Sequence, residues 1–272
     1  MSSEHNPQAE QMGDESMARN LAHQAEAIWP QEQGLFERYG LSGQLRIADI
    51  GCGTGEITRR LAARYPEARL VGIDILESNL QLARRDSASF GERIRYEQGD
   101  AFTIAYPAAS FDLVVCRHMS QAVPDFPRVL DEFTRVLKPD GWLHLLSEDY
   151  GMLHMRVGDR DPDRFWNEVV LAFLQGIGCD GRIGRHSPSL LERAGYRQIA
   201  MDYVIVDTLR VPRATFAAIL EAWRDGYADA LAKSSGRSPA SVDVEFQAII
   251  DSISQPPNYA VWHVPVASGQ RP

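Results

Sequence analysis

Residues 47–56 read Ile-Ala-Asp-Ile-Gly-Cys-Gly-Thr-Gly-Glu, and this stretch decides how the chain folds. An apolar, β-branched run that enters a cluster of glycines is typical of a buried parallel strand ending in a tight turn. Glycines let a ligand approach the backbone where a Cβ would collide, and the helix that follows presents unpaired N–H groups. The stretch therefore predicts a strand–turn–helix unit that cradles a nucleotide-sized ligand.

The spacing of the glycines narrows the type of ligand. Gly51, Gly53 and Gly55 place the third glycine one residue earlier than the dinucleotide fingerprint G-x-G-x-x-G does. Asp49 precedes the glycines and Glu56 follows them, so a pyrophosphate at this turn would meet two carboxylates. These charges favour a ligand that carries an amine, and they count against a nicotinamide-dependent oxidoreductase.

Two more acidic residues end predicted strands. Leu70-Val-Gly-Ile-Asp74 finishes nineteen residues after Gly55, and Ile94-Arg-Tyr-Glu-Gln-Gly-Asp100 repeats the arrangement. An ionised Asp74 can accept both hydroxyls of a ribose, at roughly 1.5–3 kcal/mol per charge-assisted bond. Each acid alone is as often a helix cap or a loop residue, but three acids in register with the glycine turn favour a nucleoside site.

The pattern Asp-x-Gly-x-Gly-x-Gly at residues 49–55 resembles motif I of the class I S-adenosylmethionine-dependent methyltransferases. Val136-Leu-Lys-Pro-Asp-Gly-Trp-Leu143 also resembles the family, and the likeness covers roughly residues 45–147. It implies S-adenosyl-L-methionine as cofactor. The implied cofactor neighbours are Asp49, Gly51, Cys52 and Gly53 at the methionine part, Asp74 and Ile75 at the ribose, Asp100 and Ala101 at the adenine, and Arg117 and Met119 after the fourth strand.

Strands and helices alternate with short connections, which predicts an α/β, Rossmann-like, doubly wound sheet. With the resemblance, we expect seven mostly parallel strands, N-terminal helices and a helical cap inserted late in the chain. The expected segments are a tail with lid helices (1–44), a cofactor-binding core (45–150) and the rest of the sheet with cap insertions at about 151–186 and 210–256 (151–272).

Helix and strand ends follow from local signals. Asp14 is expected to cap a helix that Pro30 ends, a second short helix ends at Gly40, and a later helix starts at Ser187. The last two strands are expected at Tyr196–Val206 and Tyr259–Val266, with two amphipathic helices between them.

Candidate catalytic residues follow the fourth and fifth predicted strands, Phe111–Cys116 and Trp142–Ser147, beside the expected methyl group. His118 has an ordinary pKa near 6.5 and could accept a proton, although it could equally be a packing residue. Glu148, Asp149 and Tyr150 could bind an amine or orient a hydroxyl, and His154 could pair with them. A base is needed only if the acceptor must lose a proton.

Composition excludes several classes of function. The formal charge is −9 and no run is rich in Lys or Arg, which argues against nucleic acid as a partner. The cysteines, Cys52, Cys116 and Cys179, form no C-x-x-C pair, so neither a metal site nor a disulfide framework is indicated. The first residues lack the pattern of a signal peptide and no apolar run is long enough to span a membrane, so we expect a cytoplasmic protein.

Together these features predict a methyltransferase that acts on O or N of a small molecule. Specialised metabolism is one setting for such an enzyme, and a homodimer is left open. Two alternatives remain at this stage: a non-catalytic module that binds S-adenosylmethionine, and an aminopropyltransferase.

Overall fold

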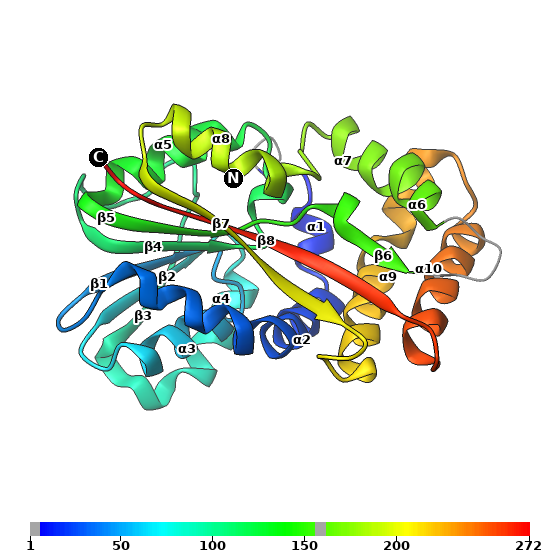
Figure 1. Cartoon of the computed structure of the whole chain (residues 1–272), viewed down its shortest axis with the longest axis horizontal. Helices are drawn as coiled ribbons and strands as arrows, with labels where there is room; N and C mark the ends of the chain where they lie inside the picture. The colour runs from blue at the N-terminus through cyan, green and yellow to red at the C-terminus, as the bar shows by residue number, and fades with distance from the viewer. Residues whose placement is uncertain (1–5, 156–161) are drawn as a thin grey trace.

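The computed structural model describes residues 6–155 and 162–272, and its centre is one mixed sheet (Figure 1). The sheet order is β3-β2-β1-β4-β5-β8-β6, and β7 pairs with β8. Strands β1 to β5 are mutually parallel where they pair, whereas β8 is antiparallel to β5, β6 and β7. The strands are β1 (Arg46–Ile50), β2 (Arg69–Asp74), β3 (Ile94–Gln98), β4 (Phe111–Arg117), β5 (Leu137–Leu146), β6 (Leu153–Met155), β7 (Arg197–Asp207) and β8 (Ala260–Gln270).

The predicted fold class is confirmed, because the seven expected strands are present in the order β3-β2-β1-β4-β5-β8-β7. The three-residue strand β6 is an addition that the sequence pattern did not predict. It exists because β8 is longer than expected: its second half pairs with β5, and its first half extends past β5 and pairs with β6.

Helices cover both faces of the sheet, as buried parallel strands require. One face packs against α5 (Phe126–Val136) and α8 (Ile183–Arg193). The other face packs against α3 (Glu56–Arg64), α4 (Glu77–Asp86) and the N-terminal helices. Alternate residues of β1 divide between the two faces: Ile47 lies in the second cluster, and Ala48 and Ile50 lie in the first.

The N-terminal helices are α1 (Ala9–Met12), α2 (Glu15–Glu32) and the 3₁₀ helix η1 (Gln33–Tyr39). Asp14 caps α2 and Gly40 ends η1, as predicted. The prediction that Pro30 ends the first helix is wrong, because α2 continues to Glu32. A proline in the last turn removes only one helical hydrogen bond, and the buried ion pair of Glu32 with Arg117 holds that turn in place.

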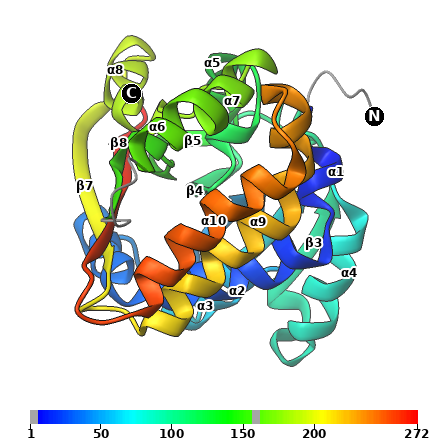
Figure 2. The same ribbon diagram turned by 90° about the vertical axis from the view of Figure 1, so that its right-hand side faces the viewer.

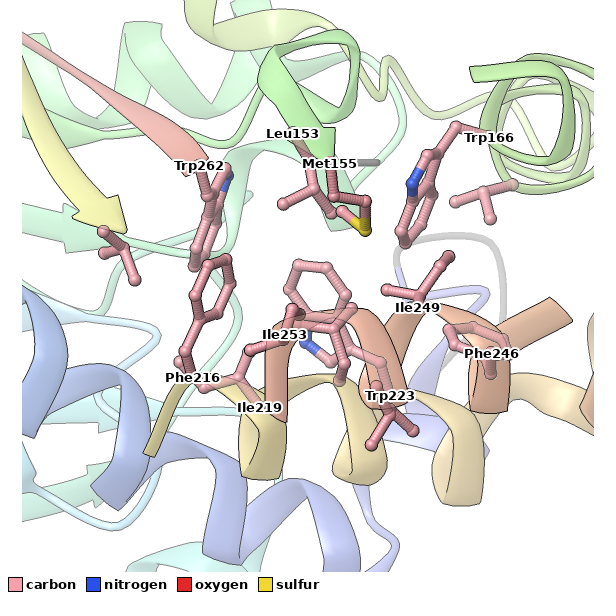
Figure 3. Packing of buried hydrophobic residues seen from close by; sticks show 14 of the residues in the cluster. Leu153, Met155, Trp166, Phe216, Ile219, Trp223, Phe246, Ile249, Ile253 and Trp262 are labelled. Carbon is pink, nitrogen blue, oxygen red and sulfur yellow. The ribbon is translucent and has the colours of Figure 1, made fainter. Parts of the chain in front are cut away.

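A further group of helices lies at the end of the molecule that is on the right of Figure 1 and faces the viewer in Figure 2. It consists of α6 (Pro162–Phe165), the π-helical η5 (Trp166–Leu171), α7 (Ala172–Gly176), α9 (Arg213–Ser235) and α10 (Pro239–Ser254). We call these helices the cap. Their apolar residues pack with Trp262 of β8 and with residues of α2, and Figure 3 shows the centre of this cluster. The cluster draws on all three predicted segments, so the boundaries at 44 and 150 stay proposals.

The predicted helix start at Ser187 is wrong by four residues. Helix α8 begins at Ile183, and Pro188 lies inside it. Burial of Ile183, Leu190 and Leu191 against the sheet outweighs the one hydrogen bond that the proline removes. Within the described parts of the chain, no helix has both the length and the apolar character needed to cross a bilayer.

Candidate active site

The glycine turn after β1 is packed so closely that side chains are excluded. Gly51 and Gly53 have φ of +73° and +52°, a region that other residues rarely adopt. A Cβ on Gly51 would lie 2.8 Å from Met119 Sδ, and a Cβ on Gly53 would collide with Leu21 of α2. The turn is therefore covered by α2 and by the segment after β4.

A pocket lies above this turn, at the carboxyl ends of β1, β2 and β4, where open parallel sheets bind ligands. Eight of the ten predicted cofactor neighbours line it: Gly51, Gly53, Asp74, Ile75, Asp100, Ala101, Arg117 and Met119. We call this the cofactor pocket. Their shared location is what the sequence predicted, while their individual roles stay predictions.

Asp74 is held in a position to accept further hydrogen bonds. Its Oδ2 accepts from the Gly53 amide at 2.8 Å and its Oδ1 from the Leu76 amide at 2.9 Å. Burial raises the pKa of this carboxyl, while its hydrogen bonds with the Leu76 and Gly53 amides act in the opposite direction. Each carboxylate oxygen keeps a lone pair that a ribose hydroxyl can use.

The other two predicted neighbours, Asp49 and Cys52, lie outside this lining. Asp49 is buried beneath the turn, where its Oδ2 accepts a 2.6 Å hydrogen bond from Thr58 of α3. Burial raises its pKa to about 6. In this conformation Asp49 anchors the glycine turn to α3, and Cys52 is buried under Gly72 on β2.

Arg117, at the end of β4, brings a positive charge into the cofactor pocket. Its Nε donates to Glu32 at 2.8 Å, and Glu32 also contacts His144 Nε2 at 2.9 Å. Burial alone would raise the pKa of Glu32, but Arg117 and His144 outweigh it and lower the pKa to about 2. Among the described residues, the buried Nη2 of Arg117 has no hydrogen-bond partner. A carboxylate of a ligand would satisfy this Nη2 donor.

A second pocket adjoins the first on the side of the cap. It is lined by polar residues of α2 and of the segments that follow β4 and β5, and by a wall of aromatic rings. The rings are Tyr150, which follows β5, and five rings of the cap: Trp166, Phe173, Trp223, Tyr227 and Phe246. We call this the acceptor pocket. Met12, Leu21, His118 and Ala122 line both pockets and so form the boundary between them.

His118 occupies that boundary as half of a buried pair. Its Nδ1 lies 2.7 Å from Oε1 of Glu148, and its Nε2 is buried with no partner among the described residues. Burial lowers the pKa of His118 below its usual 6.5, against the opposing effect of Glu148. The neutral ring therefore donates Nδ1–H to the carboxylate and keeps a lone pair on Nε2.

The sequence did not predict this pairing with Glu148. His118 and Glu148 follow neighbouring strands, but their contact depends on the register of β4 and β5, which aligns Arg117 with Leu146. A hydrophobic pattern predicts which strands exist and does not give that register.

Tyr150 and His154, the other two catalytic candidates, lie in different places. Tyr150 lines the acceptor pocket, and burial, followed by the charge of Glu148, raises its pKa well above the usual value. His154 is exposed on β6 and lines neither pocket. The structure therefore brings Tyr150 to His118 and leaves His154 apart.

Comparisons with known proteins identify chains to which this one is similar. A family described as "Methyltransferase domain" matches residues 48–145. A demethylmenaquinone methyltransferase of Deinococcus radiodurans is 40% identical over 102 residues, which are 38% of this chain and 42% of that protein. The Thermus thermophilus protein of the same name is 35% identical over 155 residues, which are 54% of this chain and 66% of that protein. The chain thus spans about half the length of these relatives.

A similar fold occurs in phosphoethanolamine N-methyltransferase 2 of Haemonchus contortus, solved in complex with S-adenosyl-L-methionine. The two structures superpose with a TM-score of 0.62 at 16% sequence identity, covering 97% of this chain and 59% of that one. At this identity the likeness concerns the fold alone.

Proposed function

Because its residues 48–145 place this chain in the class I S-adenosylmethionine-dependent methyltransferase family, we propose that it methylates a hydroxyl group of a small molecule. The observation that carries the proposal is the His118–Glu148 pair on the boundary of the two pockets. A base is needed where a hydroxyl must lose its proton, and this pair leaves a free lone pair at that boundary.

The residues of the cofactor pocket fit S-adenosyl-L-methionine. Asp74 can accept the ribose hydroxyls, Asp100 and Ala101 can hold the adenine, and the free Nη2 of Arg117 can bind the carboxylate. When bound, the cofactor supplies an electrophilic methyl group on a sulfonium. Arg117 also separates this proposal from aminopropyl transfer, since a decarboxylated donor would leave its Nη2 unsatisfied.

The chain then contributes alignment and proton removal. His118 Nε2 accepts the proton of the acceptor hydroxyl, while Glu148 holds Nδ1–H and stabilises the imidazolium that forms. Leu21 and Met12 of the N-terminal helices line the boundary and exclude water from it. Alignment of two reactants supplies on the order of 7–11 kcal/mol, and a positioned base adds roughly 10²–10⁴-fold.

The proposal is tested by following transfer of labelled methyl from S-adenosyl-L-methionine to a panel of hydroxylated aromatic compounds. His118→Gln should lower kcat about 100-fold or more while the affinity for S-adenosylhomocysteine stays unchanged. His154→Gln is the matched control and should keep wild-type turnover, because His154 lines neither pocket.

Two results would reject the proposal. Wild-type turnover by His118→Gln would remove the base from the mechanism. Tight binding of S-adenosylhomocysteine without methyl transfer to any acceptor would favour the non-catalytic binding module.

A further inference from the structure

Five residues that line the acceptor pocket each carry a buried polar atom without a hydrogen-bond partner among the described residues. The atoms are Asn20 Oδ1, His118 Nε2, Gln121 Oε1, Glu148 Oε2 and Trp166 Nε1. Buried polar atoms in folded proteins are nearly always paired with protein, water or ligand, so a group of five in one pocket points to the ligand that completes them.

Three of these atoms are hydrogen-bond acceptors whose chemistry is fixed by their neighbours. Gln121 Nε2 donates to the backbone oxygen of His118 at 2.8 Å, which leaves Oε1 as the free end of that amide. Glu148 binds His118 Nδ1 through Oε1, which leaves Oε2 free and His118 Nε2 as an acceptor. The Tyr150 side chain interacts with both Glu148 and Gln121, yet the two free oxygens have no partner at hydrogen-bonding distance in the described chain. A ligand in this pocket must therefore supply hydrogen-bond donors at more than one point.

The charged residues around the acceptor pocket narrow the class of ligand further. None of the described residues that line the acceptor pocket is a lysine or an arginine, and Glu148 is its only acidic residue. Arg117, the cation nearest in the chain to His118, lines the cofactor pocket and is bound to Glu32. An anionic ligand would be desolvated here without a counter-charge and beside a carboxylate, which disfavours carboxylates and phosphates.

The aromatic wall of the acceptor pocket favours a ligand that contains rings. Trp166 of η5, Trp223 of α9 and Phe246 of α10 come together in the cap (Figure 3). Trp166 stands nearly perpendicular to both of the others, at 87° and 90°, with centroids 6.1 and 6.2 Å apart. Such edge-to-face walls offer flat apolar surfaces, and aromatic ligands pack on them well.

We propose that the methyl acceptor is an uncharged aromatic molecule with at least two hydroxyl groups. One hydroxyl is the nucleophile at His118 Nε2, and another donates to Glu148 Oε2 or Gln121 Oε1. This inference rests on the proposed function, since it names the substrate class of the same site.

An ammonium compound would also supply hydrogen-bond donors, but the His118–Glu148 pair disfavours such a compound as the methyl acceptor. A protonated amine must lose a proton before it can attack the methyl group, and the carboxylate of Glu148 stabilises the protonated, unreactive form. A phenol in the same place keeps its proton until His118 takes it.

The experiment measures equilibrium binding of four matched probes to the full chain in the presence of S-adenosylhomocysteine. The probes are 2,3-dihydroxynaphthalene, naphthalene, 3-hydroxy-2-naphthoate and 1-naphthylmethylammonium. We expect the diol to bind about tenfold or more tightly than each of the others, the difference that one or two hydrogen bonds produce. A diol that binds no better than naphthalene, or a naphthoate or ammonium probe that binds as well as the diol, overturns the inference.

A variant tests the polar contact itself. Gln121→Met keeps the side-chain volume and removes the acceptor, so the ratio of diol to naphthalene affinity should fall several-fold. Leu231→Met, at an apolar position of the same pocket, is the control and should keep the ratio. An unchanged ratio in Gln121→Met, with the probes bound, counts against the assigned contact.

The experiment distinguishes failure of the proposed substrate class from failure of the proposed methyl transfer. If the diol binds selectively but receives no methyl group, the substrate class stands and the methyl transfer falls. If methyl groups are transferred only to the naphthoate or to the ammonium probe, methyl transfer stands and the substrate class falls.

Discussion

At the scale of single residues, His118 combines an unusual backbone with an unusual environment. Its φ is +53°, a region that non-glycine residues seldom occupy, and its amide donates to Leu146 at 3.0 Å. Strained residues of this kind concentrate at functional sites, where the surrounding structure holds them in place. In this conformation Nδ1 of the ring lies 2.7 Å from Oε1 of Glu148.

The pH dependence of turnover should report this pair. Burial lowers the His118 pKa, so kcat/KM should stay high through pH 6.5 and fall only as the pH drops through the lowered value and His118 becomes protonated. In Glu148→Gln the negative charge that raises this pKa is lost, although the amide oxygen can still accept Nδ1–H. The acid limb should therefore move to still lower pH, and the plateau rate should fall roughly 100-fold because a neutral amide does not stabilise the imidazolium that forms.

Arg117 and Glu32 act on His118 in opposite directions and are unchanged in this variant. Glu97→Gln, on β3, is the control and should leave the limb in place, because its partner is Tyr106. A limb that moves to higher pH in Glu148→Gln would contradict the assigned direction.

Asp74 should decide cofactor affinity. Asp74→Asn keeps an acceptor for a backbone amide but removes the charge and one acceptor, so S-adenosylhomocysteine should bind at least about tenfold more weakly by calorimetry. Asp112→Asn is the matched control. Asp112 lies on β4 but pairs with Lys138 and the Arg46 amide, outside the cofactor pocket, so its replacement should leave affinity unchanged.

At the scale of elements, the buried ion pair of Glu32 joins α2 to the sheet. Glu32 ends α2, Arg117 ends β4 and His144 lies in β5, so one carboxylate fixes three elements. Breaking such a pair leaves an uncompensated buried charge and costs roughly 3–5 kcal/mol. Glu32→Gln should therefore lower the free energy of unfolding in urea at pH 7 by about that amount.

The pH dependence of this loss follows from the Glu32 pKa. The carboxyl has a pKa of about 2 in the folded protein against an ordinary value of 4.5, so its contribution is present above pH 4.5 and is lost as the pH falls towards 2. The difference in stability between the wild type and Glu32→Gln should narrow over that range. A difference that stays constant would reject the assignment. Glu37→Gln, at an exposed position of η1, should stay within about 0.5 kcal/mol of wild type.

The elements show what the sequence could and could not predict. The alternation of strands and helices from β1 to β5 follows from local patterns and glycine turns, so it was predictable. Three features depend on partners that are distant in the chain. Helix α2 continues past Pro30, helix α8 begins before Pro188, and strand β6 pairs with β8. Local proline signals predict a break, and tertiary burial overrides them.

The same division holds for the site. Asp74 ends β2 and Asp100 follows β3 by two residues, so their place in the pocket was predictable from position alone, since the carboxyl ends of adjacent parallel strands meet at one edge. Two pairings were not predictable, that of Asp49 with Thr58 and that of His118 with Glu148. They depend on the direction of the side chains and on the register of the strands.

At the scale of the whole molecule, the acceptor pocket depends on a core that is separate from the cores on the two faces of the sheet. The aromatic wall of the acceptor pocket belongs to the cluster that joins α2, the cap and β8, whereas Trp142 belongs to the cluster on one face of the sheet. Both Trp223 and Trp142 are buried, with 6% and 4% of their surfaces exposed. Replacing either ring therefore removes a similar amount of buried surface from a different core.

Trp223→Leu and Trp142→Leu should accordingly give similar losses of stability, about 3 kcal/mol each by urea unfolding. Their effects on binding should differ. Because Trp223 lines the acceptor pocket, Trp223→Leu should weaken binding of 2,3-dihydroxynaphthalene about tenfold and leave the affinity for S-adenosylhomocysteine unchanged. Trp142→Leu should change neither affinity, because Trp142 lies outside both pockets. Equal losses of diol affinity in the two variants would mean that the acceptor site responds to overall stability and that the cap does not form it.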